Sequence, residues 1–80
     1  MFSIFDQKGK AFMRPFAAPT TAFALRSFAD MASEADSFVA KHPEDYFLFR
    51  VGSFKEEDGS VEAEKVSLGC ALEFLPGGEG

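Results

Sequence analysis

The sequence predicts a small two-layer α+β domain, in which one main helix packs on an antiparallel sheet and the elements follow the order β-β-α-β-β. Segments with alternating apolar and polar residues flank a central segment whose apolar residues recur at helical spacing. At 80 residues, the chain has room for one domain. We assign residues 1–75 to this domain and the glycine-rich residues 76–80 to a flexible tail.

The N-terminal residues predict a β-hairpin. Met1–Phe5 is apolar and suits a strand, and Asp6–Gly9 has the composition of a turn, with Gly9 able to adopt a positive φ. Lys10–Phe16 then alternates as a second strand would. This alternation places three residues on one face of that strand: Phe12, Arg14 and Phe16.

The middle of the chain predicts the helix. A threonine hydroxyl in Pro19–Thr21 can cap the free N–H groups of a first turn. From Ala22 to Ala32 the chain is rich in alanine, and its larger apolar residues recur at helical spacing. Phe38–Ala40 adds a short helical piece, which must end before Pro43 because proline disfavours helix in the residue that precedes it.

The last third of the chain predicts the second pair of strands. Tyr46–Phe54 alternates most regularly, and this alternation places Phe49 on the face opposite Tyr46. Glu56–Ser60 is an acidic turn, after which Val61–Lys65 returns as a half-exposed strand. Val66–Leu75 fits either a strand or a short helix by periodicity alone.

A single helix covers only one face of such a sheet. The opposite face is then partly apolar and has to be used or hidden. A homodimer is an economical way to cover it, and it adds buried surface to the marginal core of so small a chain. We therefore expect a homo-oligomer, with a dimer favoured.

The charge is distributed unevenly. The formal net charge is -5, whereas nucleic-acid-binding domains are typically basic. Residues 1–55 hold seven basic and six acidic residues, and residues 56–80 hold one basic and seven acidic residues. A positive face in the first two-thirds is therefore compatible with the sequence if the acidic end points elsewhere or competes for that face. In the plainer interpretation, the acids only keep a chain with eleven phenylalanines soluble.

The sequence lacks an arrangement typical of an enzyme. His42 lies beside Pro43, a setting more typical of a structural or exposed histidine than of a catalytic one. Cys70 is the single cysteine, which excludes a disulfide framework, and no base partner is evident for it. We therefore expect no enzymatic activity, no cofactor and no metal site. No apolar run approaches the roughly 18 residues of a membrane-spanning helix, so we expect no membrane partner.

One group of residues has the composition of a site for single-stranded nucleic acid, in which cations follow the phosphates and rings stack on the bases. Arg14 lies between two phenylalanines of the predicted second strand, and Tyr46 and Arg50 share a face of the third. The candidate site has nine members: Lys8, Lys10, Arg14, Arg26, Arg50, Lys55, Phe12, Phe16 and Tyr46. The plainer alternative makes Phe12 and Phe16 core residues and Arg14 an edge charge.

The segment Lys41–Phe54, which reads KHPEDYFLFRVGSF, resembles a known family. The small non-structural protein of gokushoviruses, the single-stranded DNA phages of the microvirus family, carries a similar segment followed by an acidic turn. Two further segments of this chain are similar to that family: Leu25–Phe28 in the predicted alanine-rich helix and Phe5–Lys8 at the end of the first predicted strand. The resemblance covers roughly residues 2–60.

This resemblance implies a DNA-binding accessory protein of phage replication, without enzymatic activity, in the cytoplasm of the bacterial host. Such proteins are assigned to the switch from duplex replication to single-stranded genome synthesis and packaging, which makes single-stranded DNA the expected partner. The alternative is a protein-interaction module without DNA affinity, which recruits phage replication or capsid proteins through a Phe-rich patch or a free strand edge. A positive patch beside exposed rings favours the first hypothesis, and scattered cations beside an apolar groove favour the second.

Overall fold

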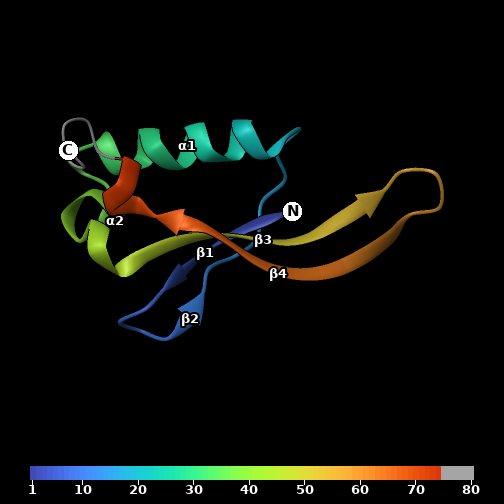
Figure 1. Ribbon diagram of the computed structural model, residues 1–80, viewed down its shortest axis with the longest axis horizontal. Helices are drawn as coiled ribbons and strands as arrows, with labels where there is room; N and C mark the ends of the chain where they lie inside the picture. Colours follow the sequence, from blue (N-terminus) through green and yellow to red (C-terminus); the bar gives the residue numbers. More distant parts are fainter. Residues whose placement is uncertain (75–80) are drawn as a thin grey trace.

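The predicted two-layer α+β architecture is confirmed by a computed structural model, which describes residues 1–74 (Figure 1). The predicted tail, residues 76–80, lies outside the described residues. The elements are β1 (Phe2–Asp6), β2 (Ala11–Phe12), α1 (Thr21–Ser33), α2 (Phe38–Lys41), a 3-10 turn (Pro43–Asp45), β3 (Tyr46–Lys55), β4 (Ser60–Cys70) and a second 3-10 turn (Ala71–Phe74). Helix α1 forms one layer and the four strands form the other (Figure 1).

The sheet has the strand order β2-β1-β3-β4, and all neighbouring strands are antiparallel. Strand β1 therefore lies in the interior of the sheet, between the short β2 and the long β3. Phe2, Ile4 and Leu48 point toward α1, since the residues opposite one another in β1 and β3 share a face. They pack with three buried residues of the helix: Ala24, Phe28 and Ala32.

The first hairpin is held by the side chain of Asp6. Its carboxylate accepts the backbone N–H groups of Lys8 at 3.0 Å and Gly9 at 3.1 Å. A Cβ atom on Gly9 would lie 2.8 Å from that carboxylate, so a larger residue here would require the Asp6 side chain to shift. The positive φ expected at Gly9 instead occurs at Lys10, with φ 58°.

The second strand is shorter than predicted. Regular pairing ends at Phe12, and the chain then continues beside β1 through the Met13 N–H bond to Ile4 and an isolated bridge between Phe16 and Phe2. Pro15 lies in the interruption, where its missing N–H group costs no ladder bond. The expected common face of Phe12, Arg14 and Phe16 is therefore wrong, because the strand that would align them ends at Phe12.

The segment that fitted either a strand or a short helix contains both. Strand β4 extends to Cys70, and the 3-10 turn follows directly. Two irregularities interrupt the register between β3 and β4, at Leu48/Phe49 and between Arg50 and Gly52. Such bulges increase the local twist of a two-stranded ribbon.

Strands β3 and β4 continue well past the rest of the sheet. Strand β1 pairs with β3 only as far as Arg50, whereas the β3–β4 pairing continues to Lys55 opposite Ser60. We call the protruding two-stranded ribbon, residues 53–62, the arm. It extends beyond the end of α1 at the right of Figure 1 and gives the molecule its long dimension of 42 Å.

Candidate nucleic-acid interface

Three phenylalanines cluster on the sheet face that α1 leaves open. Phe5 lies opposite Phe12 in the β1–β2 pair, and Phe49 lies opposite Ser3, so all three rings point away from the core residues Phe2 and Ile4. The ring centroids of Phe5 and Phe12 are 4.7 Å apart, and those of Phe12 and Phe49 are 5.2 Å apart. We call these three residues the aromatic platform. Phe12 is 41% exposed, which is enough to offer a ring face to a ligand.

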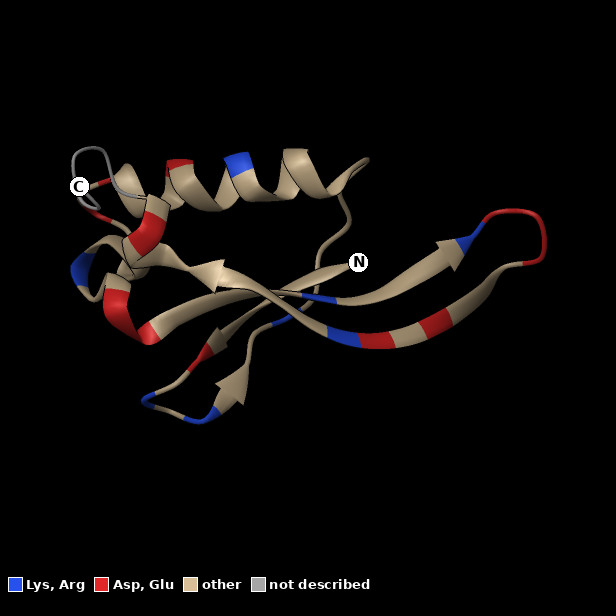
Figure 2. Cartoon of the chain, in the orientation of Figure 1, with Lys and Arg blue, Asp and Glu red and all other residues tan. Residues whose placement is uncertain are grey.

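One lysine contacts the aromatic platform, and two more lie in the turn that leads into β2. Lys65 Nζ lies 5.8 Å from the centroid of the Phe12 ring, within the range of a cation–π contact. Lys8 and Lys10 are exposed in the turn that leads into β2 (Figure 2). Within residues 1–74, none of these three ammonium groups lies in a salt bridge. This arrangement can stack an unpaired base on the rings and place cations along a phosphate chain.

Arg50 lies on the other face and is already paired. Its guanidinium forms a salt bridge of 3.1 Å with Glu64, and Ser53 Oγ donates a hydrogen bond of 2.9 Å to the same carboxylate. The Ser53 hydrogen bond and then the Arg50 contacts lower the pKa of Glu64, despite partial desolvation. Arg50 is therefore not a free cation for a phosphate.

Tyr46 and Phe16 pack on the helix side of the sheet. Tyr46 does share a face with Arg50, as expected, but its ring meets Phe38 edge-on at 5.1 Å and packs against the core. Burial raises the pKa of Tyr46, and the carboxylates of Asp6 and Asp45 add to that effect. The Phe16 ring lies 6.0 Å from that of Phe2. Neither residue joins Phe12, so the plainer alternative holds for Phe16.

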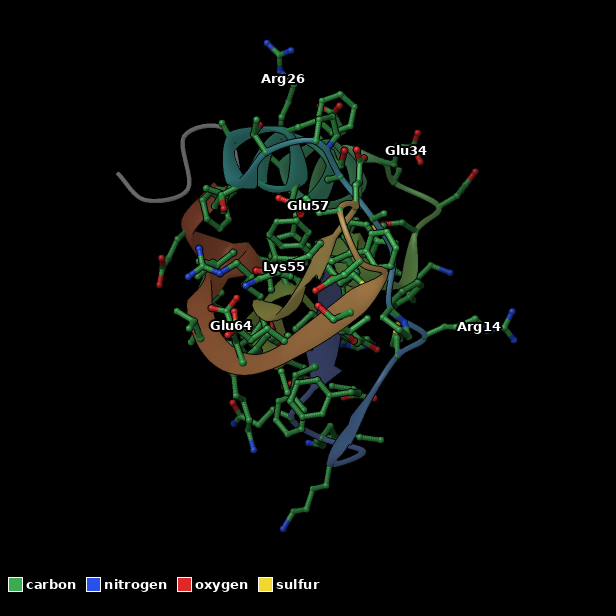
Figure 3. The ribbon with its side chains drawn as sticks, turned by 90° about the vertical axis from the view of Figure 1, so that its right-hand side faces the viewer. Arg14, Arg26, Glu34, Lys55, Glu57 and Glu64 are labelled. Atoms are coloured by element: carbon green, nitrogen blue, oxygen red, sulfur yellow. The ribbon has the colours of Figure 1, made fainter. Side chains whose placement is uncertain are left out.

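The remaining three candidate cations lie far from one another. Arg14 is exposed on the segment after β2, Arg26 on the outer side of α1, and Lys55 at the end of β3 beside the acidic turn. Figure 3 shows Arg14 and Arg26 pointing in different directions. The predicted nine-residue site is therefore divided: Phe12 belongs to the aromatic platform, and Lys8 and Lys10 lie in the turn that leads into β2.

Sequence reasoning missed Phe5, Phe49 and Lys65. A signal for Phe5 was available: with a turn centred between Lys8 and Gly9, antiparallel pairing sets residue 5 opposite residue 12. Phe49 was expected on the opposite face of β3 from Tyr46, which is where it lies. The position of Lys65 depends on the bulge in β4, which no local pattern of residues indicates.

Two of the hollows in the described part of the chain bear on the functional hypotheses. A shallow cavity of about 630 Å³ is lined by seven residues: Asp6, Lys8, Gly9, His42, Glu44, Asp45 and Tyr46. In this cavity, one possible ligand atom from each of His42, Glu44 and Asp45 lies within 4.8 Å of the other two. Among residues 1–74, this is the only group of three or more such side chains close enough to hold a metal ion. Exposed acidic groups commonly gather without one, so we assign it no metal.

The second hollow is a smaller apolar groove of about 170 Å³ between α1 and residues 16–18. Phe16, Phe23 and Met31 line it, and Phe23 is 51% exposed at this surface. Both features that would separate the two functional hypotheses are thus present, on different sides of the molecule.

A model of the Phage ORF5 protein family matches residues 1–74. The chain belongs to this family. It is therefore a phage protein, as the resemblance implied. No curated protein and no solved structure matches the chain. Among the described residues of this phage protein, no helix is both long enough and apolar enough to span a membrane.

Proposed function

We propose that this phage protein binds single-stranded DNA on the open face of its sheet. The observation that carries the proposal is the juxtaposition of the aromatic platform with Lys65, whose ammonium group lies 5.8 Å from the Phe12 ring. Lys8 and Lys10 extend the positive border into the turn. An open sheet face with an exposed ring suits unstacked bases, which offer their π-faces, better than a duplex, which hides them.

In the phage, we propose the role of the gokushovirus non-structural protein: DNA binding during the switch from duplex replication to single-stranded genome synthesis and packaging, in the bacterial cytoplasm. The similarity of Lys41–Phe54 to that protein supports this role. Binding needs no cofactor and no catalytic group, so the proposal assigns no reaction to the protein.

A fluorescence-anisotropy titration with single- and double-stranded oligonucleotides at two salt concentrations tests the proposal. Three lysines predict that log K falls with log[salt] at a slope of about -2 for single strands. Phe12→Leu removes the planar ring but keeps an apolar side chain. It should weaken binding about fivefold or more, since stacking contributes roughly 1–3 kcal/mol per base.

Phe23→Leu is the matched control, because Phe23 is similarly exposed but lies on α1. Equal affinities of the two variants would remove the aromatic platform from the site. An oligonucleotide that fails to associate even at low salt would contradict DNA binding altogether.

Protein recruitment is the second candidate function, and the apolar groove beside α1 is the observation that favours it. A phage replication or capsid protein would insert an apolar side chain beside Phe23. Phage carrying Phe23→Asp should then lose progeny, whereas phage carrying Phe12→Leu should not. The reverse pattern would favour the aromatic platform.

A further inference from the structure

The arm ends in an acidic, partly apolar tip that has no partner among residues 1–74. Glu56, Glu57 and Asp58 are exposed, and none of them lies in a salt bridge within the described chain. The Asp58 carboxylate is used by its own turn, where it accepts the Ser60 N–H at 3.0 Å and the Ser60 hydroxyl at 2.7 Å. The two glutamates are therefore the free anions of the tip.

An exposed apolar pair lies directly beside these acids. Phe54 is 57% exposed, and Val61, its neighbour across the two strands, is 54% exposed. These two are the most exposed large apolar residues among residues 1–74. A surface that combines carboxylates with an aromatic ring matches a partner that combines cations with aromatic rings.

The aromatic platform and its lysine border are such a partner, but the tip cannot reach those of its own chain. Pairing of β3 with β1 ends at Arg50, and the ribbon stays paired up to Lys55 opposite Ser60. At about 3.3 Å per residue, the tip is held roughly 17 Å beyond the sheet. It is directed away from the lysines of the β1–β2 turn (Figure 2).

We propose that the acidic tip of one copy docks on the aromatic platform of a second copy. In this contact, Glu56 and Glu57 face Lys8 and Lys65, and Phe54 extends the cluster of rings. A two-fold axis makes the exchange reciprocal, so that each copy gives one arm and receives one.

The same surface then serves self-association and DNA binding, and the acidic tip competes with phosphates for the lysines. This second part rests on the proposed function, whereas the self-association does not. Competition between copies differs from simple repulsion of DNA by the acids, because it depends on protein concentration. Repulsion between exposed charges is also largely screened beyond about 8–10 Å at physiological salt.

Sedimentation velocity without DNA tests the contact by charge exchange. The tip-reversed variant carries Glu56→Lys and Glu57→Lys, and the platform-reversed variant carries Lys8→Glu and Lys65→Glu. Each variant alone should associate about tenfold more weakly than wild type, since like charges then meet. An equimolar mixture should regain association, because each tip again meets a platform of opposite charge.

The control is Lys41→Glu, which reverses an exposed lysine outside the proposed contact and should leave association unchanged. Circular dichroism verifies that each variant folds. If the platform-reversed variant does not fold, the double variant Lys8→Gln/Lys65→Gln takes its place. A monomeric wild type, or a mixture no more associated than its two components, would overturn the inference.

A competition titration tests the shared surface. The platform-reversed variant keeps a wild-type tip, so adding it should displace an oligonucleotide from wild-type protein. A variant with all four changes should not. If wild type binds DNA but the platform-reversed variant does not displace the oligonucleotide, the inference of a shared surface is overturned. DNA binding by wild type is then unaffected. If neither wild type nor the tip-reversed variant binds DNA, the proposed function fails and the sedimentation result alone decides self-association.

Discussion

Glu64 holds Arg50 in place on β3. Both Nε and Nη2 of Arg50 lie 3.1 Å from Glu64 Oε1, while Ser53 Oγ donates to Glu64 Oε2 at 2.9 Å. The guanidinium charge is thereby compensated by a residue of the neighbouring strand, β4. A phosphate would have to displace the carboxylate, which would then be left without its partner.

Removing this ion pair as a unit should leave DNA affinity nearly unchanged. The double variant Arg50→Gln/Glu64→Gln keeps the net charge, and we expect its affinity for a single-stranded oligonucleotide to stay within about twofold of wild type. Lys65→Gln should weaken binding and reduce the magnitude of the salt slope by about 0.7, since one phosphate contact is lost. Anisotropy titrations at several salt concentrations measure both. A large loss in the double variant would return Arg50 to the binding surface.

Ser53→Ala should raise the pKa of Glu64, because the Ser53 hydrogen bond is the largest cause of its lowering. Carboxyl NMR titration measures this pKa directly, and Ser67→Ala is a matched control on β4. A Glu64 pKa that is the same in Ser53→Ala as in wild type would contradict the assignment.

The lowered pKa of Glu64 also has a consequence for stability. A carboxyl whose pKa is lower in the folded state stabilises the fold above its unfolded-state pKa, and that contribution is lost as the pH falls through the folded-state pKa. The melting temperature of Glu64→Gln should therefore lie below that of wild type at neutral pH and approach it on acidification. A difference that stays constant across this range would exclude the linkage.

Phe28→Ala should destabilise the fold far more than Phe23→Ala, although both remove the same atoms from α1. Phe28 is 1% exposed between the helix and the sheet, whereas Phe23 is 51% exposed. Deleting a buried phenylalanine costs about 3–5 kcal/mol, and an exposed change usually less than about 1 kcal/mol. Urea denaturation gives both values. Similar losses would mean that α1 packs on the sheet through a different face.

The features that were predictable from the sequence depend on neighbours in the chain. Helix α1 begins and ends within one residue of the predicted Ala22–Ala32, because its capping and its apolar spacing are local properties. The alternation of β3 likewise assigned Phe49 to the face opposite Tyr46 correctly. A period of two needs no knowledge of the partner strand.

The features that were not predictable depend on how distant segments align. Glu64 is fourteen residues from Arg50 along the chain, and a bulge between Arg50 and Gly52 sets which β4 side chains reach β3. The same bulge affects where Lys65 lies relative to Phe12. Composition could therefore indicate that rings and cations were available, but the register between strands determined which of them meet.

Thr20→Ala should destabilise the fold by about 1 kcal/mol, because its hydroxyl caps α1. Thr20 Oγ1 accepts the Phe23 N–H at 3.0 Å, in the extended conformation typical of an N-cap residue. Thr21→Ala is the matched control: it removes the same atoms one residue later, inside the helix, where alanine is the better helix former and the change should be neutral or slightly stabilising. Urea denaturation of both variants separates them. If Thr21→Ala were the more destabilising change, the helix would begin at a different residue from the one its cap indicates.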